Sequence, residues 1–172
     1  MRPVYLTGEH VYLRAVQESD KEHAPAWIDS PFPVSQVNAE KIFKQIRETN
    51  DERGRVRLII CRKENDEVVG GATVRGSNRS ADLKFHMAPW LDDADSLRAD
   101  ALSVLFRWQR NEHEPILIFV DIPGDQPETL EAASRLGLAE GARMTEWIAR
   151  AGHRVDLVMC QWVSEEVEAV RA

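Results

Sequence analysis

The sequence predicts a single α/β domain, residues 1–172, with helices packed on a mixed sheet. Two observations support this fold class. Segments of alternating or continuous apolar residues, typical of strands, are interrupted by segments of helical periodicity. In addition, a three-strand meander in the middle of the chain precedes two helices that each connect one strand to the next, which implies crossover connections. The predicted order is β-α-α-β-β-β-α-β-α-β-β.

Strands are predicted where apolar residues alternate or run together. These segments are residues 11–16, 55–62, 68–75, 80–87 and 116–122, and a long hairpin at 142–162 that turns at Ala151 and Gly152. The segment ILIFVDI at 116–122 is continuously apolar, as in a central strand that is buried on both faces. Turns at 63–67 and 76–79 separate the three strands of the meander.

Helices are predicted where apolar residues recur at steps of three and four. These are a short helix that starts at Ser19 or Asp20 and ends at 27, a second at 39–50, a long one that ends near 111, a fourth at 127–138, and a loose helix in the tail at 163–172. Asn38 is predicted to cap the second helix, and Gly137 to end the fourth. The proline-rich segment 29–35 is predicted to be an irregular loop.

Composition and charge exclude several classes of partner. Hydrophobic residues make up 43% of the chain, charged residues 30%, and the net charge is -7. An acidic chain disfavours nucleic acid and anionic membrane surfaces as partners. The chain has no apolar run near the roughly 20 residues of a membrane span and no signal-peptide core at its start, so a cytoplasmic protein is expected. Cys61 and Cys160 read as buried thiols, and the histidines lack metal-ligand spacing, so no metal is expected.

The long helix begins with three carboxylates, Asp92, Asp93 and Asp95. The first N–H groups of a helix have no partner within the helix and carry a partial positive charge. We therefore predict that these aspartates cap their own helix. Farther along, Leu97, Ala101, Leu105 and other residues at the same spacing form one apolar stripe.

Four segments, in their order and spacing, resemble the GNAT superfamily of acetyl-coenzyme A-dependent N-acetyltransferases. They are LTGEHVYLRAVQESD (6–20), VVGGATV (68–74), QPETLEAASRLGLAEGAR (126–143) and GHRVDLVMCQW (152–162). The likeness is greatest to the branch that acts on ribosomal-protein and other amino termini. It implies the GNAT fold, with a central, mostly antiparallel sheet flanked by helices. It also implies acetyl-coenzyme A as cofactor and, as acceptor, an amine of a small molecule or of a protein N-terminus.

The resemblance also assigns residues to the cofactor. These are Met87, Ala88, Leu91, Ala94, Ser96, Leu97 and Gln126. The superfamily's Gln/Arg-x-x-Gly-x-Gly/Ala turn falls on residues 91–96, which here read Leu-Asp-Asp-Ala-Asp-Ser. The turn lacks the glycines that let a backbone approach a pyrophosphate closely, and its carboxylates would repel phosphate.

Candidate catalytic groups follow from the chemistry of acetyl transfer, which needs a deprotonated amine and donors for developing negative charge. Asp82 and His86 share one face of the strand 80–87. The resemblance makes Asp82 the candidate general base, with His86 as the alternative. Asp82 would equally suit the solvent-exposed face of a half-buried strand. Thr129 could donate its hydroxyl or simply cap its helix. Ala133 stands where many relatives have a tyrosine acid.

Two functions of different class remain open at this stage. The whole-chain resemblance favours an N-acetyltransferase. The altered turn at 91–96, Lys84-Phe85 in place of the family's common Gly-Tyr, and Ala133 favour a non-catalytic binding or regulatory relative that has lost the cofactor loop. The strand edges and the C-terminal hairpin would suit a homodimer.

Overall fold

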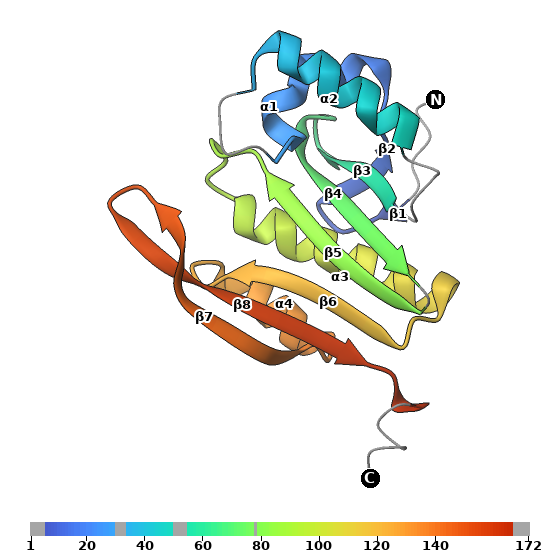
Figure 1. Cartoon of the computed structure of the whole chain (residues 1–172), viewed down its shortest axis with the longest axis vertical. Helices are drawn as coiled ribbons and strands as arrows, with labels where there is room; N and C mark the ends of the chain where they lie inside the picture. The colour runs from blue at the N-terminus through green and yellow to red at the C-terminus, as the bar shows by residue number, and fades with distance from the viewer. Residues whose placement is uncertain (1–5, 30–33, 50–54, 78, 167–172) are drawn as a thin grey trace.

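One eight-stranded sheet organises the part of the chain that the computed structural model describes, residues 6–29, 34–49, 55–77 and 79–166. Its strands are β1 (Leu6–Thr7), β2 (Val11–Ala15), β3 (Arg55–Arg62), β4 (Val68–Ser77), β5 (Ser80–Met87), β6 (Leu117–Pro123), β7 (Ala139–Arg150) and β8 (His153–Val163). They lie in the order β1-β2-β3-β4-β5-β6-β8-β7 (Figure 1). Neighbours are antiparallel except β5 and β6, which are parallel. The predicted mixed, mostly antiparallel sheet is therefore confirmed.

Helices cover both faces of this sheet. They are α1 (Ala24–Trp27), which follows the 3-10 turn η1 (Glu18–His23), then α2 (Gln36–Thr49), α3 (Ala94–His113) and α4 (Pro127–Arg135). One cluster of buried side chains joins α1 and α2 to β2, β3 and β4. A second, larger cluster joins α3 and α4 to the opposite face. None of the helices among the described residues is both long and apolar enough to cross a membrane.

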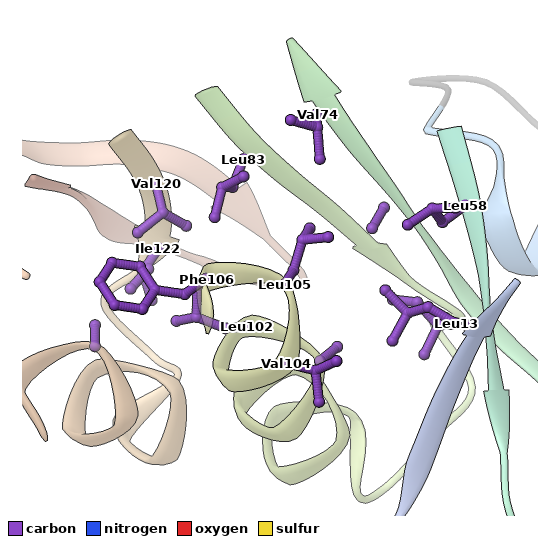
Figure 2. Packing of buried hydrophobic residues seen from close by; sticks show 14 of the residues in the cluster. Leu13, Leu58, Val74, Leu83, Leu102, Val104, Leu105, Phe106, Val120 and Ile122 are labelled. Atoms are coloured by element: carbon purple, nitrogen blue, oxygen red, sulfur yellow. The ribbon is translucent and has the colours of Figure 1, made fainter. Parts of the chain in front are cut away.

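The apolar stripe of α3 packs against the sheet as its periodicity predicts. Leu102, Leu105 and Phe106 of the helix are almost fully buried and point toward Leu83 and Val120 of the strands (Figure 2). Burial of one such side chain stabilises the fold by about 1.5–3 kcal/mol. This packing fixes the start of α3 beneath the junction of β5 and β6, where the candidate site lies.

Two helix predictions need correction, and a third can be tested only in part. The helix η1–α1 is split, its first turn being a 3-10 turn. The capping prediction for Asn38 is wrong because α2 begins earlier, at Gln36. The amide of Asn38 donates to Ser35 Oγ (3.3 Å) and that of Ala39 to the Ser35 carbonyl (2.8 Å), so Ser35 has the capping role. Of the predicted tail helix, residues 167–172 lie outside the described residues.

The sheet opens between β5 and β6. These strands pair only from Ser80↔Leu117 to Leu83↔Val120. Beyond that point β5 stays with β4 as far as Met87, and β6 stays with β8 as far as Pro123. The two strands therefore diverge toward their carboxyl ends, as Figure 1 shows, with α3 on one side of the opening. The edge of β5 that faces the gap, residues 84–87, has no neighbouring strand among the residues that the structure describes.

Candidate active site

A cavity of about 700 Å³ lies where β5 and β6 diverge. Its wall comes from the end of β5 and the turn after it, the first turns of α3, the end of β6, the start of α4 and the β7–β8 hairpin. Among its lining residues are Asp29, Lys84, Phe85, His86, Arg98 and Gln126. A second cavity of about 310 Å³ lies on the α1 side of β3, β4 and β5. The two cavities share Asp29, Lys84, Phe85 and His86, so they meet at the end of β5.

Two glycines of β4 allow this junction to form. A Cβ atom on Gly71 would lie 2.7 Å from the backbone oxygen of Trp27, so only glycine lets the end of α1 approach the strand this closely. A Cβ on Gly70 would collide with the backbone oxygen of His86. The pair therefore holds Asp29, just after α1, beside the carboxyl end of β5.

His86 is one of three titratable groups at the meeting point of the two cavities, with Asp29 and Lys84. Its Nδ1 lies 3.8 Å from Asp29 Oδ1, and its Nε2 is buried without a hydrogen-bond partner. Burial lowers the pKa of His86 below its usual value of 6.5, and the opposing effects of Asp29 and the Pro25 backbone are smaller. The imidazole is therefore neutral at pH 7 and able to accept a proton. Because the Asp29 side chain is 91% exposed, it can pass that proton to solvent.

Arg98, in the second turn of α3, is a buried cation that the sequence analysis missed. Its guanidinium donates to the backbone oxygen of Phe85 and to Gln126 Oε1, so it bridges the gap between β5 and α4. The residue is 8% exposed and its Nε has no partner. Burial lowers the pKa of Arg98 to about 10, so it stays charged at pH 7. A signal was present, because Arg98 shares the spacing of Leu102 and Leu105 on the apolar stripe.

The predicted cofactor residues fall into two groups. Those that line the large cavity are Met87, Ala88, Leu91, Ala94 and Gln126. Ser96 and Leu97 instead line a separate cavity of about 460 Å³ between the start of α3 and the β2–β3 side of the sheet. The Ser96 hydroxyl donates to the backbone oxygen of Asp93 (3.1 Å), and Leu97 is buried in the core.

The prediction that the aspartates cap their own helix is wrong. Asp93 stands at the N-cap position of α3 but makes no side-chain capping bond. Its carboxylate instead pairs with both terminal nitrogens of Arg62 (2.5 and 3.1 Å), and that contact lowers the pKa of Asp93. The carboxylate of Asp95 reaches α4. Because two of the three charges are thus engaged elsewhere, they repel a phosphate at the start of α3 less than the sequence suggests.

Asp95 ties the start of α3 to the start of α4. Its carboxylate accepts the amides of Glu128 (2.9 Å) and Thr129 (3.0 Å) and the Thr129 hydroxyl (2.6 Å). Asp95→Ala should lower the free energy of unfolding by about 2–3 kcal/mol, because it leaves the first amides of α4 without an acceptor and leaves the buried Thr129 hydroxyl only the backbone oxygen of residue 95, at 3.2 Å. Thermal denaturation should show a fall of roughly 4–12 °C. Asp92→Ala, at an exposed neighbour, is the control, and equal melting of both variants would contradict the capping role.

The candidate catalytic residues are not all brought together. Asp82 lies farther down β5, within the paired part and outside both lining sets, with Lys84 Nζ 3.9 Å from its carboxylate. The Thr129 hydroxyl is committed to Asp95. Ala133 is buried in the core. The described residues contain no group of three or more histidine, cysteine, aspartate or glutamate side chains arranged to hold a metal.

Solved structures that share this arrangement include several acetyltransferases. A candidate acetyltransferase from Sphaerobacter thermophilus is 47% identical, with a TM-score of 0.77 over 95% of this chain and 100% of the other. Ribosomal-protein-S5-alanine acetyltransferase from Vibrio fischeri has a TM-score of 0.67 at 11% identity, over 94% and 98% of the two chains. Spermidine N-acetyltransferase from Vibrio cholerae, in complex with CoA and spermine, has a TM-score of 0.61 at 16% identity, over 90% and 95%. No family model and no curated protein matches the sequence.

The opened sheet and the cavity within it thus define an acyltransferase-type fold. The 47% identity over nearly the whole of both chains shows the family, and the chain belongs to the GNAT family of acetyltransferases. The more distant structures support the fold alone.

Proposed function

We propose that the protein is an acetyl-coenzyme A-dependent N-acetyltransferase that acts on a primary amine. The observation that carries this proposal is the cavity between the diverging ends of β5 and β6, which meets a second cavity at His86. When bound, acetyl-coenzyme A supplies an acetyl group activated as a thioester. One cavity thus suits the cofactor and the other the acceptor.

The residues of the large cavity fit such a cofactor. The free edge of β5 at 84–87 can pair with an amide-bearing arm, and Met87, Ala88, Leu91 and Gln126 would line its path. Among the described residues, the first amides of α3 have no acceptor, so they can donate to a pyrophosphate. The unpartnered Nε of Arg98 adds a buried donor within reach of the same cavity. The small side chain of Ala94 keeps the cavity wide at this point, whereas a larger side chain would narrow it.

The acceptor side supplies a base. Neutral His86 can take the proton of an acceptor ammonium, and Asp29 can relay it to solvent. The Nδ1–Oδ1 separation of 3.8 Å is longer than a hydrogen bond, and such contacts often tighten only when substrate binds. Two of the solved neighbours are a ribosomal-protein-S5-alanine acetyltransferase and a spermidine/spermine N-acetyltransferase, and this supports an amine as acceptor.

A melting curve with acetyl-coenzyme A tests the proposal. At about 100 times its dissociation constant, a ligand that binds only the folded state stabilises it by roughly 2.7 kcal/mol. For a chain of this size the melting temperature should rise by roughly 5–10 °C. Arg98→Gln should diminish the shift, whereas Arg135→Gln, at an exposed position on α4, should leave it unchanged. An unchanged melting temperature at millimolar acetyl-coenzyme A would contradict the proposal.

Acetyl transfer itself must be measured separately, by mass spectrometry on a panel of primary amines. Transfer to any of them supports the enzyme. Cofactor binding without transfer to any amine would favour the non-catalytic relative. That alternative has no support among the solved neighbours.

A further inference from the structure

The second cavity has a cationic wall on its side away from His86. Arg57 of β3 and Arg75 of β4 both line it. The strand register places Arg75 directly opposite Arg55, and Arg57 opposite Thr73. Since residues two apart in a strand share a face, the three arginines lie on the face of the sheet that bears this cavity.

Among the described residues neither Arg57 nor Arg75 forms an ion pair, and the buried Nε of Arg57 has no hydrogen-bond partner. The β4–β5 register places the carboxylate of Asp82 on the strand position opposite Arg75, so Arg57 is the less compensated of the two cations. Burial, together with the nearby charges of Arg55 and Arg75, lowers the pKa of Arg57. Like charges directly opposite one another destabilise a sheet, and a partly desolvated cation without a partner costs more. An anionic ligand would offset both costs.

The other cationic and acidic groups give the cavity a polarity. Lys84 lies within 3.9 Å of the carboxylates of Asp82 and Asp121, so its charge is already balanced. At the opposite end, where the two cavities meet, stand Asp29 and neutral His86. The cavity is therefore suited to hold a positive group at one end and a negative group at the other.

We propose that the acceptor is a primary amine that also carries a carboxylate. The amine lies at His86 and Asp29, and the carboxylate is held by Arg57 and Arg75. This inference rests on the proposed function and names the substrate class for the same site. Arg57 lies two strands and two residues away from His86, which separates their Cα atoms by roughly 12 Å. Both side chains cover part of that distance, so an acceptor in which about five methylene groups join the amine to the carboxylate fits between them.

Three amines that differ only in the far group test the proposal. They are ε-aminocaproate, with a carboxylate, aminohexanol, with a hydroxyl, and hexamethylenediamine, with a second ammonium. Calorimetric titration into the full-length protein at pH 7 should show that ε-aminocaproate binds at least about 10-fold more tightly than the other two, since a hydrogen-bonded ion pair is lost in each. A parallel pair of dipeptide amides, Ala-Glu and Ala-Gln, shows whether a peptide can present the same carboxylate.

Matched variants localise the effect. Arg57→Gln should weaken ε-aminocaproate binding by about 10–100-fold and leave aminohexanol binding within about twofold. Arg57→Lys keeps the charge but not the planar fork, so it should restore part of the affinity. Arg55→Gln removes the same charge from the same strand at a position outside the cavity wall, and it should change binding little. Circular dichroism establishes that each variant is folded.

Each outcome is decisive. Preference for the diamine, no measurable binding of any probe, or equal effects of Arg57→Gln and Arg55→Gln would overturn the inference. Carboxylate-dependent binding that Arg57→Gln abolishes supports it. If that binding occurs but no probe is acetylated in the presence of acetyl-coenzyme A, the inference stands and the proposed enzymatic function fails.

Discussion

Replacement of Asp20 by Asn is expected to lower the free energy of unfolding by about 3–5 kcal/mol. Asp20 and Arg14 form a two-pronged ion pair, with Nη1–Oδ2 and Nη2–Oδ1 distances of 2.8 and 2.7 Å, and each side chain is no more than 2% exposed. Asparagine keeps the shape but leaves the Arg14 cation buried without its counter-charge. The backbone oxygen of Asp20 also accepts the indole N–H of Trp27, so the loss reaches the end of α1.

Urea denaturation measures this effect. The control is Glu131→Gln, which breaks an exposed pair with Arg135 and should change stability by less than about 1 kcal/mol. The double variant Arg14→Met/Asp20→Leu removes both charges and should recover a large part of the loss, since apolar residues often replace a buried pair at little cost. A loss below 1 kcal/mol for Asp20→Asn would show that the pair is solvated.

Replacement of His86 by Ala is expected to lower turnover on the order of 10²–10⁴-fold if His86 is the general base. Asp82→Asn is the matched comparison on the same strand face. It should leave turnover nearly unchanged, because Asp82 lies outside both cavities. The reverse result, loss in Asp82→Asn and none in His86→Ala, would assign the base to Asp82.

The pH profile provides a second readout of His86. The neutral imidazole is the active form, and burial lowers its pKa below 6.5. Activity should therefore persist below pH 6.5 and fall only as the pH drops through the lowered pKa. In the pH profile of the activity that remains in His86→Ala, this fall at low pH should be absent. A limb above pH 6.5 in the parent would contradict the buried, neutral histidine.

Much of the fold follows from local patterns in the sequence. The predicted bounds of β3 and β5 match the structure, because both strands alternate or run apolar between clear turn residues. Gly137 ends the fourth helix region with a φ of +83°, as its place after the apolar run predicts. The two-residue strand β1 has too little sequence to produce any periodicity.

The site was less predictable because its partners are distant in sequence. Local reasoning assigned Asp93 and Asp95 to their own helix, yet Arg62 and Thr129, about thirty residues away on either side, hold them. Arg98 was missed for a related reason, since only the packing shows that a cation on the apolar stripe bridges to Phe85. Sequence patterns report which face of an element is buried, but they do not report which side chain meets a given charge.

The order of strands in the sheet has a consequence for how the chain folds. Apart from the exchange of β7 and β8, spatial order follows chain order, so most strands pair with the strand that precedes them. The pairings among β3, β4 and β5 join strands that follow one another closely in sequence, and such local contacts form fastest. On the ribosome, β1 to β5 can pair completely before β6 is synthesised. The parallel contact of four register pairs between β5 and β6 is then the step that joins an already ordered amino-terminal half to the later strands.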